Sequence, residues 1–188
     1  LVANHHIVFN EIPSLKIALP GIHTTAHFLF KFAFPSAKKL QHVVFSEIES
    51  LVLNHQVDAG VIIHENRFTY ESKGLFKLLD LGTHWVEQNQ LPIPLGLIAI
   101  KRSLNPELKL QIKASIQASI TFSNDHYPKI YPFIARHAQE LSEEVIKKHI
   151  DLYVNEHSYS LNSASKSAIH KLFTLSHPTL DTSTLNLI

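Results

Sequence analysis

The sequence contains no cysteine, and this absence excludes disulfides, thiolate catalysis and cysteine-based zinc sites together. It also lacks an apolar run of about 18 residues and a basic segment followed by an apolar one, the patterns of a transmembrane helix and a secretion signal. The net charge is only +1, so no polybasic surface is available to drive binding to nucleic acid or a membrane. The hydrophobic fraction of 45% is ample for the core of a globular protein.

Methionine is absent as well, and residue 1 is a leucine. A natural start codon would place methionine first, so we expect either a fragment or a sequence whose methionine positions were lost in processing. Histidine, in contrast, is abundant, with fourteen residues. These are scattered, and apart from the adjacent His5 and His6 they form no metal-binding spacing such as HExxH or HxH. We therefore expect no metal site.

The first half of the chain alternates short apolar runs with segments of helical pattern. Because strand–helix alternation of this kind is typical of a parallel sheet with right-handed crossovers, it predicts an α/β fold. In chain order, the pattern predicts a strand over 16–19, a helix capped by Thr24 or Thr25 and ended by Pro35, a strand over 43–45, a short helix over 46–52 and a strand over 61–64.

The second half begins after a stiff segment, residues 91–96, which holds two prolines and a glycine. We expect one α/β lobe over residues 1–92. Residues 93–188 are predicted to form one strand, 97–100, and four helices, of which one begins after Asn105 and one at Ser142. A single strand cannot form a sheet of its own, so this part is predicted to complete a lobe whose N-terminal part is missing.

His64 is the first candidate for chemistry, because it follows the apolar run Val61-Ile62-Ile63 at the carboxyl end of a predicted strand. Ligands of open α/β sheets bind beyond that end, and the pKa of histidine, ordinarily near 6.5, suits a general base at neutral pH. The alternative is a structural histidine bonded to backbone, and composition alone favours that alternative.

Four separated segments, in this order, resemble one enzyme family: Pro20-Gly-Ile-His-Thr-Thr-Ala26, Ile63-His-Glu-Asn-Arg-Phe-Thr-Tyr70, Asp80-Leu-Gly82 and Leu91-Pro-Ile-Pro-Leu-Gly96. Two later segments, 137–142 and 149–155, look like the same family, the 1,4-dihydroxy-6-naphthoate synthases of the futalosine pathway of menaquinone biosynthesis. The resemblance implies a fold similar to type II periplasmic binding proteins, with two α/β lobes and the ligand in the interlobe cleft. It implies a cytoplasmic lyase that converts cyclic de-hypoxanthine futalosine to 1,4-dihydroxy-6-naphthoate without a metal.

The resemblance also implies roles for individual residues. The proposed base of the family falls on His64, and the substrate-contacting Thr-Ala pair falls on Thr25 and Ala26. A helix start attracts anions, so the carboxylate of the substrate suits this place, with Thr24 serving as the cap or as a further contact. Plain capping by both threonines is the alternative.

Neighbouring residues are weaker candidates. Arg67 and His23 are each considered as further substrate contacts, and Glu65 is predicted to pair structurally, because strand alternation turns it away from His64. Trp85 and His149 are predicted to be packing residues.

The chain departs from the family at its front, where the first third of the enzyme, with a Ser-Pro-Cys-Pro-Asn-Asp-like and a Lys-Leu-Ser-like stretch, is not present. Two rival hypotheses are a non-catalytic solute-binding protein of the same fold and an inactive gene remnant. A secretion signal upstream would favour the first rival.

Overall fold

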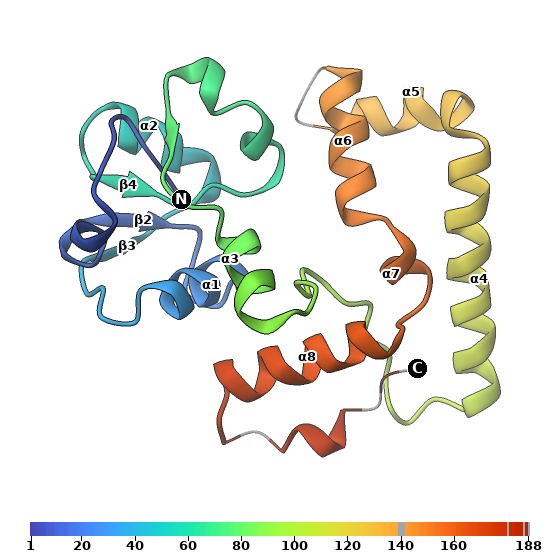
Figure 1. Ribbon diagram of the computed structural model, residues 1–188. Helices are drawn as coiled ribbons and strands as arrows, with labels where there is room; N and C mark the ends of the chain where they lie inside the picture. The colour runs from blue at the N-terminus through green and yellow to red at the C-terminus, as the bar shows by residue number, and fades with distance from the viewer. Residues whose placement is uncertain (139–141, 180, 186, 188) are drawn as a thin grey trace. The chain divides into compact units, whose positions relative to one another are not determined.

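The computed structural model describes residues 1–138, 142–179, 181–185 and 187. It divides into two compact units, Leu1–Ile93 and Pro94–Ile188 (Figure 1). Each unit is described by itself below.

The first unit is built on a five-stranded sheet with the strand order β3-β2-β4-β1-β5. The central strand β2 pairs in parallel with β3 and β4, whereas β1 pairs antiparallel with β4 and β5. The bounds of the strands are β1 Val2–Ala3, β2 Ile17–Leu19, β3 Leu40–His42, β4 Ala59–Gly60 and β5 Phe76–Lys77. The α/β class is therefore confirmed as a mixed sheet with helices.

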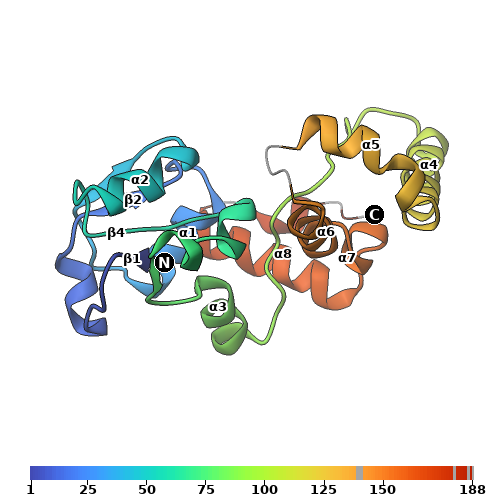
Figure 2. The same ribbon diagram turned by 90° about the horizontal axis from the view of Figure 1, so that it is seen from above.

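Helices cover both faces of this sheet. They are α1 Thr25–Ala33, α2 Ile48–Leu53 and α3 Leu81–Asn89. The connection from β2 to β3 and the connection from β3 to β4 cross the sheet in opposite directions, so right-handed crossovers place α1 and α2 on opposite faces. Figures 1 and 2 show α2 on one side of the strands and α3, which packs on α1, on the other.

Trp85 anchors the contact between α1 and α3. Its side chain is fully buried, its ring meets Phe28 and Phe32 edge-on at centroid distances of 5.8 and 5.4 Å, and its Nε1 donates to the carbonyl oxygen of Pro92 at 3.1 Å. The packing role predicted for Trp85 is therefore confirmed.

Gly60 allows α2 to lie directly on β4. A Cβ at this position would overlap the Cγ2 of Ile48 and lie 3.1 Å from the Cγ2 of Val52, and both of these side chains are fully buried. Because overpacking a tight core forces backbone shifts, we expect Gly60→Ala to lower the free energy of unfolding by about 1–3 kcal/mol in urea denaturation. The matched control is Gly96→Ala, where a Cβ meets nothing within 4 Å. Equal stability of the two variants would contradict this packing.

The second unit is helical over most of its described residues. Its helices are α4 Pro106–Asp125, α5 Tyr127–His137, α6 Glu143–Tyr153, α7 Glu156–Tyr159 and α8 Ser163–Ser176. The predicted cap of α4 is confirmed, since the Asn105 side chain accepts from the Glu107 backbone N–H at 2.8 Å. His149 is half-buried with its ring 4.7 Å from Tyr153. Among the described residues, every helix is too short or too polar to span a membrane.

Three strand predictions were wrong in place or in kind. Residues 97–100 are irregular, since the described part of the second unit offers no strand to pair with them. Pairing with β2 puts β3 at 40–42, and Phe45–Glu47 forms a 3₁₀ turn. The third predicted strand, 61–64, lies directly after the observed strand β4, which ends at Gly60. The Val61 N–H still donates to the Ala18 carbonyl oxygen at 2.9 Å, and His64 then opens a 3₁₀ turn, His64–Phe68.

Candidate functional site

Three chain segments meet the same edge of the first unit's sheet. They follow the parallel neighbours β2, β3 and β4, and the carboxyl ends of such strands share one edge. The segments are the loop from Pro20 into α1, residues 43–45, and residues 61–64. The sequence-predicted base and the predicted substrate-binding helix start therefore belong to one edge of one sheet.

The start of α1 is fixed by Thr24. Gly21, with φ of +112°, takes a backbone conformation that favours glycine and turns the chain after β2. The Thr24 hydroxyl donates to the Gly21 carbonyl oxygen at 2.7 Å and accepts from the His27 N–H at 3.1 Å. The cap predicted for Thr24 or Thr25 is thus Thr24.

Thr25 and Ala26 are the first two residues of α1. In the described part of the chain, their backbone N–H groups find no hydrogen-bond acceptor, because the cap and the first helical bond serve His27 and Phe28. The Thr25 hydroxyl likewise has no partner among the described residues. Two such N–H groups at the positive end of a helix dipole form a place where an anion can bind.

His64 lies in the 3₁₀ turn with a strained backbone. Its φ is +58°, in the left-handed region, which costs an ordinary residue about 1–2 kcal/mol. Its side chain is not enclosed in the core, because the residue is half-buried. The imidazole meets the Phe45 ring edge-to-face with a centroid distance of 5.0 Å. Strain of this kind clusters at functional sites, but His55 and Gln90 share the left-handed backbone, so the role of His64 as the base stays a prediction.

Arg67 is directed to Asp80. The guanidinium Nη2 lies 3.6 Å from Asp80 Oδ2, and the Arg67 Cζ lies 5.6 Å from the ring centroid of Phe68. Its predicted contact with substrate stays a prediction and competes with this ion pair. The Glu65 side chain lies outside the described residues, but its strand-alternation argument fails because residues 64–68 form a 3₁₀ turn.

The Asp80-Leu-Gly82 motif is the N-terminal cap of α3. Asp80 Oδ1 accepts from the backbone N–H groups of Gly82 at 2.9 Å and Thr83 at 3.0 Å. Burial acts to raise the pKa of Asp80, but the Thr83 N–H, the Arg67 charge and the Gly82 N–H outweigh it and hold this pKa below its ordinary value. The motif therefore serves the fold, and it also ties Arg67 to α3.

A histidine pair at the same edge was missed by sequence reasoning. His42 Nε2 and His27 Nδ1 are 3.0 Å apart, joining the end of β3 to the first turn of α1, and His23 is exposed nearby in sequence. Only the register of β3 against β2 brings these rings together, so no local pattern could have revealed the pair. Burial first, and then the charges of His42, Lys31 and His23, lower the pKa of His27. Among the described residues no three potential ligands are grouped to hold a metal ion.

The lowered pKa of His27 predicts a pH dependence of stability. Because the unfolded chain binds this proton more readily, stability is fully present above the unfolded pKa, near 6.5, and falls as the pH decreases below it. We expect the free energy of unfolding of His27→Gln to fall less between pH 7.5 and pH 5 than that of the parent, measured by urea denaturation at several pH values. Parallel pH curves for the two proteins would contradict the shift.

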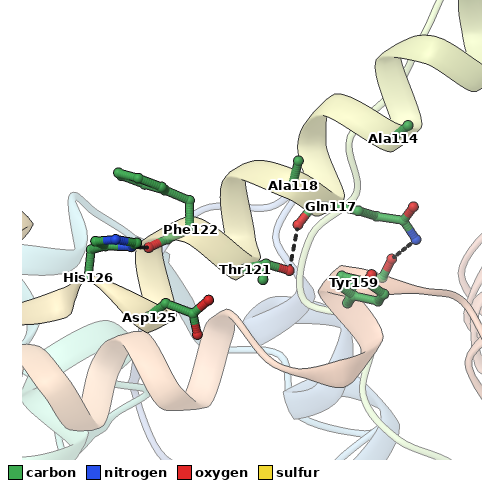
Figure 3. A pocket seen from close by; sticks show the side chains of 8 residues that line it. All are labelled: Ala114, Gln117, Ala118, Thr121, Phe122, Asp125, His126 and Tyr159. Carbon is green, nitrogen blue, oxygen red and sulfur yellow. Dashed lines mark hydrogen bonds between the residues drawn. The ribbon is translucent and has the colours of Figure 1, made fainter.

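The second unit has a groove of about 480 Å³ between α4 and α7 (Figure 3). Its wall includes the stacked rings of Phe122 and His126, with centroids 4.2 Å apart, and Gln117 Nε2, which donates to the Tyr159 carbonyl oxygen at 2.9 Å. None of the site residues predicted from the sequence lines this groove.

Comparison with known proteins decides the family. The family model described as "Menaquinone biosynthesis" matches residues 1–178. The chain belongs to this menaquinone biosynthesis family. Two curated relatives are named 1,4-dihydroxy-6-naphtoate synthase. The one from Thermus thermophilus is 36% identical over 162 residues, covering 86% of this chain and 59% of the relative. The one from Streptomyces coelicolor is 37% identical over 169 residues, covering 87% of this chain and 60% of the relative.

A solved structure agrees with the fold of this family member. The crystal structure of a protein from Archaeoglobus fulgidus matches with a TM-score of 0.85 at 33% identity, over 94% of this chain and 66% of that one. The resemblance expected from the four motifs is thereby confirmed at the level of the family. The chain spans about three fifths of the length of the two curated relatives.

Proposed function

We propose that this chain is a large part of a 1,4-dihydroxy-6-naphthoate synthase, a lyase that acts on cyclic de-hypoxanthine futalosine. The observation that carries the proposal is that the α1 start and the strained His64 follow neighbouring parallel strands, β2 and β4, at one sheet edge. The first two N–H groups of α1 find no acceptor among the described residues. The two curated relatives, which are named 1,4-dihydroxy-6-naphtoate synthase, support the reaction. The proposed enzyme works in the cytoplasm without a metal or cofactor.

In this proposal the α1 start holds the carboxylate of the substrate. The N–H groups of Thr25 and Ala26 donate to the anion, while Thr24 keeps its capping role and holds the helix start rigid. His23 and Arg67 are proposed as secondary contacts at this edge, and Arg67 would have to leave Asp80 to make one.

His64 is the proposed general base. Its imidazole removes an acidic or hydroxyl proton, so that a carbon–carbon bond breaks toward the aromatic product and the sugar-derived three-carbon piece departs. A positioned base of this kind contributes about 10²–10⁴-fold to the rate. The proposed fold is that of type II periplasmic binding proteins, in which the first unit is a whole lobe and the second unit belongs to the other lobe.

The test is a turnover assay on the protein at its natural length. Cyclic de-hypoxanthine futalosine is added, and 1,4-dihydroxy-6-naphthoate is followed by liquid chromatography and mass spectrometry. The proposal expects product formation that requires His64. Binding of the compound without formation of product would favour the non-catalytic solute-binding protein instead. If the compound is neither bound nor converted, the proposal is overturned.

A further inference from the structure

Two contacts join the segment after β3 to the segment at the end of β4. The first is the buried contact of Ile48 with Gly60, which is possible only because glycine has no Cβ. The second lies three residues before Ile48 and four residues after Gly60, where the rings of Phe45 and His64 meet at 5.0 Å with their planes at 69°. The same two segments are therefore in contact twice, once in the core at Ile48 and Gly60 and once at the rings of Phe45 and His64.

The backbone around Phe45 supports a fixed ring position. Phe45 opens a 3₁₀ turn, Phe45–Glu47, in which the Glu47 N–H donates to the Val44 carbonyl oxygen at 3.0 Å, and the turn runs directly into α2. Ile48, the first residue of α2, is fully buried in the core. A side chain anchored so close to the core is suited to hold a neighbour in one orientation, which a reacting group requires.

The edge-to-face geometry restricts the imidazole in particular. Aromatic pairs prefer this arrangement at centroid distances between about 4.5 and 7 Å. A rotation of the His64 ring away from the edge-to-face orientation therefore loses a favourable contact with the Phe45 ring. The left-handed backbone of His64 sets the direction of its Cα–Cβ bond, and the contact with Phe45 sets the orientation of its ring.

We infer that Phe45 is a positioning residue for His64, holding the imidazole in the orientation in which it accepts the proton of the substrate. This inference rests on the proposed function, because it assigns Phe45 a part in that same reaction. It goes beyond the sequence pattern, which predicts only a strand over residues 43–45.

The experiment compares Phe45→Leu, Phe45→Tyr and the parent, all at natural length. We expect Phe45→Leu to lower kcat about 3- to 10-fold, the range that an aromatic pair of this kind is worth, with KM changed less than twofold. Phe45→Tyr keeps the ring and is expected to retain kcat within twofold. The matched control is Phe76→Leu, which removes another phenylalanine–histidine contact, the one with His6 at 4.9 Å, and is expected to leave kcat unchanged.

Proton NMR of the His64 ring supplies a readout that does not depend on turnover. The His64 signals among those of the fourteen histidines are assigned from their loss in His64→Asn. We expect these signals to shift in Phe45→Leu and to stay in Phe76→Leu. An active parent whose kcat is unaltered by Phe45→Leu overturns the inference alone, whatever the shift of the His64 signals. A parent that forms no product overturns the proposed function, and the role of Phe45 in that reaction with it.

Discussion

Replacing His64 with glycine is expected to lower turnover by about 10²–10⁴-fold without loss of stability. The loss of rate follows from removing the proposed base. Stability is expected to stay within about 1 kcal/mol of the parent or to rise, because glycine relieves the cost of φ +58°, which offsets the lost ring contact with Phe45. The measurements are product formation and urea denaturation of the same preparations.

Gln90 provides the matched control for this substitution. It also has a left-handed backbone, with φ of +54°, at the exposed C-terminal end of α3. We expect Gln90→Gly to relieve strain in the same way, a gain of up to about 1 kcal/mol, with turnover unchanged. If His64→Gly retained full turnover, or if it only unfolded the protein, His64 would be a structural histidine.

Removing the Thr25 N–H is expected to weaken binding of the product carboxylate by roughly 10- to 150-fold, the value of a hydrogen bond to a charged group. Thr25→Pro makes this change with little effect on the helix, because proline suits the first helical position. The preceding residue, Thr24, already has the extended backbone that proline requires, with φ −111° and ψ 151°. The measurement is the Kd for 1,4-dihydroxy-6-naphthoate by isothermal titration calorimetry.

Thr25→Ala separates the hydroxyl from the backbone group. It keeps the N–H and removes the hydroxyl, so we expect a loss of affinity below about tenfold. Circular dichroism of both variants reports whether α1 is retained. Equal affinities for Thr25→Pro and Thr25→Ala would show that the N–H does not hold the carboxylate, and the proposed anion site at α1 would then be wrong.

Local signals were enough to predict the start of α1 and of α4. Pro20 and Gly21 end the strand before α1, and Thr24 begins the helix. Asn105 followed by proline marks the start of α4. Each helix start therefore depends on a few adjacent residues. The base candidate was likewise recognisable from its place after an apolar run.

What depends on pairing between distant segments could not be predicted. Pairing with β2 places β3 three residues earlier than the second predicted strand. Phe45 therefore lies outside the strand, and its ring contacts His64. The same register brought His42 to His27. An apolar run such as 97–100 has strand propensity, but without a neighbouring strand in its own unit it stays irregular.

The most direct test of the account is chemical rescue of His64→Gly by free imidazole. The glycine variant leaves the space of the ring empty, so added imidazole is expected to restore part of the turnover in proportion to its neutral fraction, while acetate at the same concentration does not. A folded His64→Gly protein that forms product at the parent rate without imidazole would contradict the central claim that the His64 ring accepts the proton of the substrate.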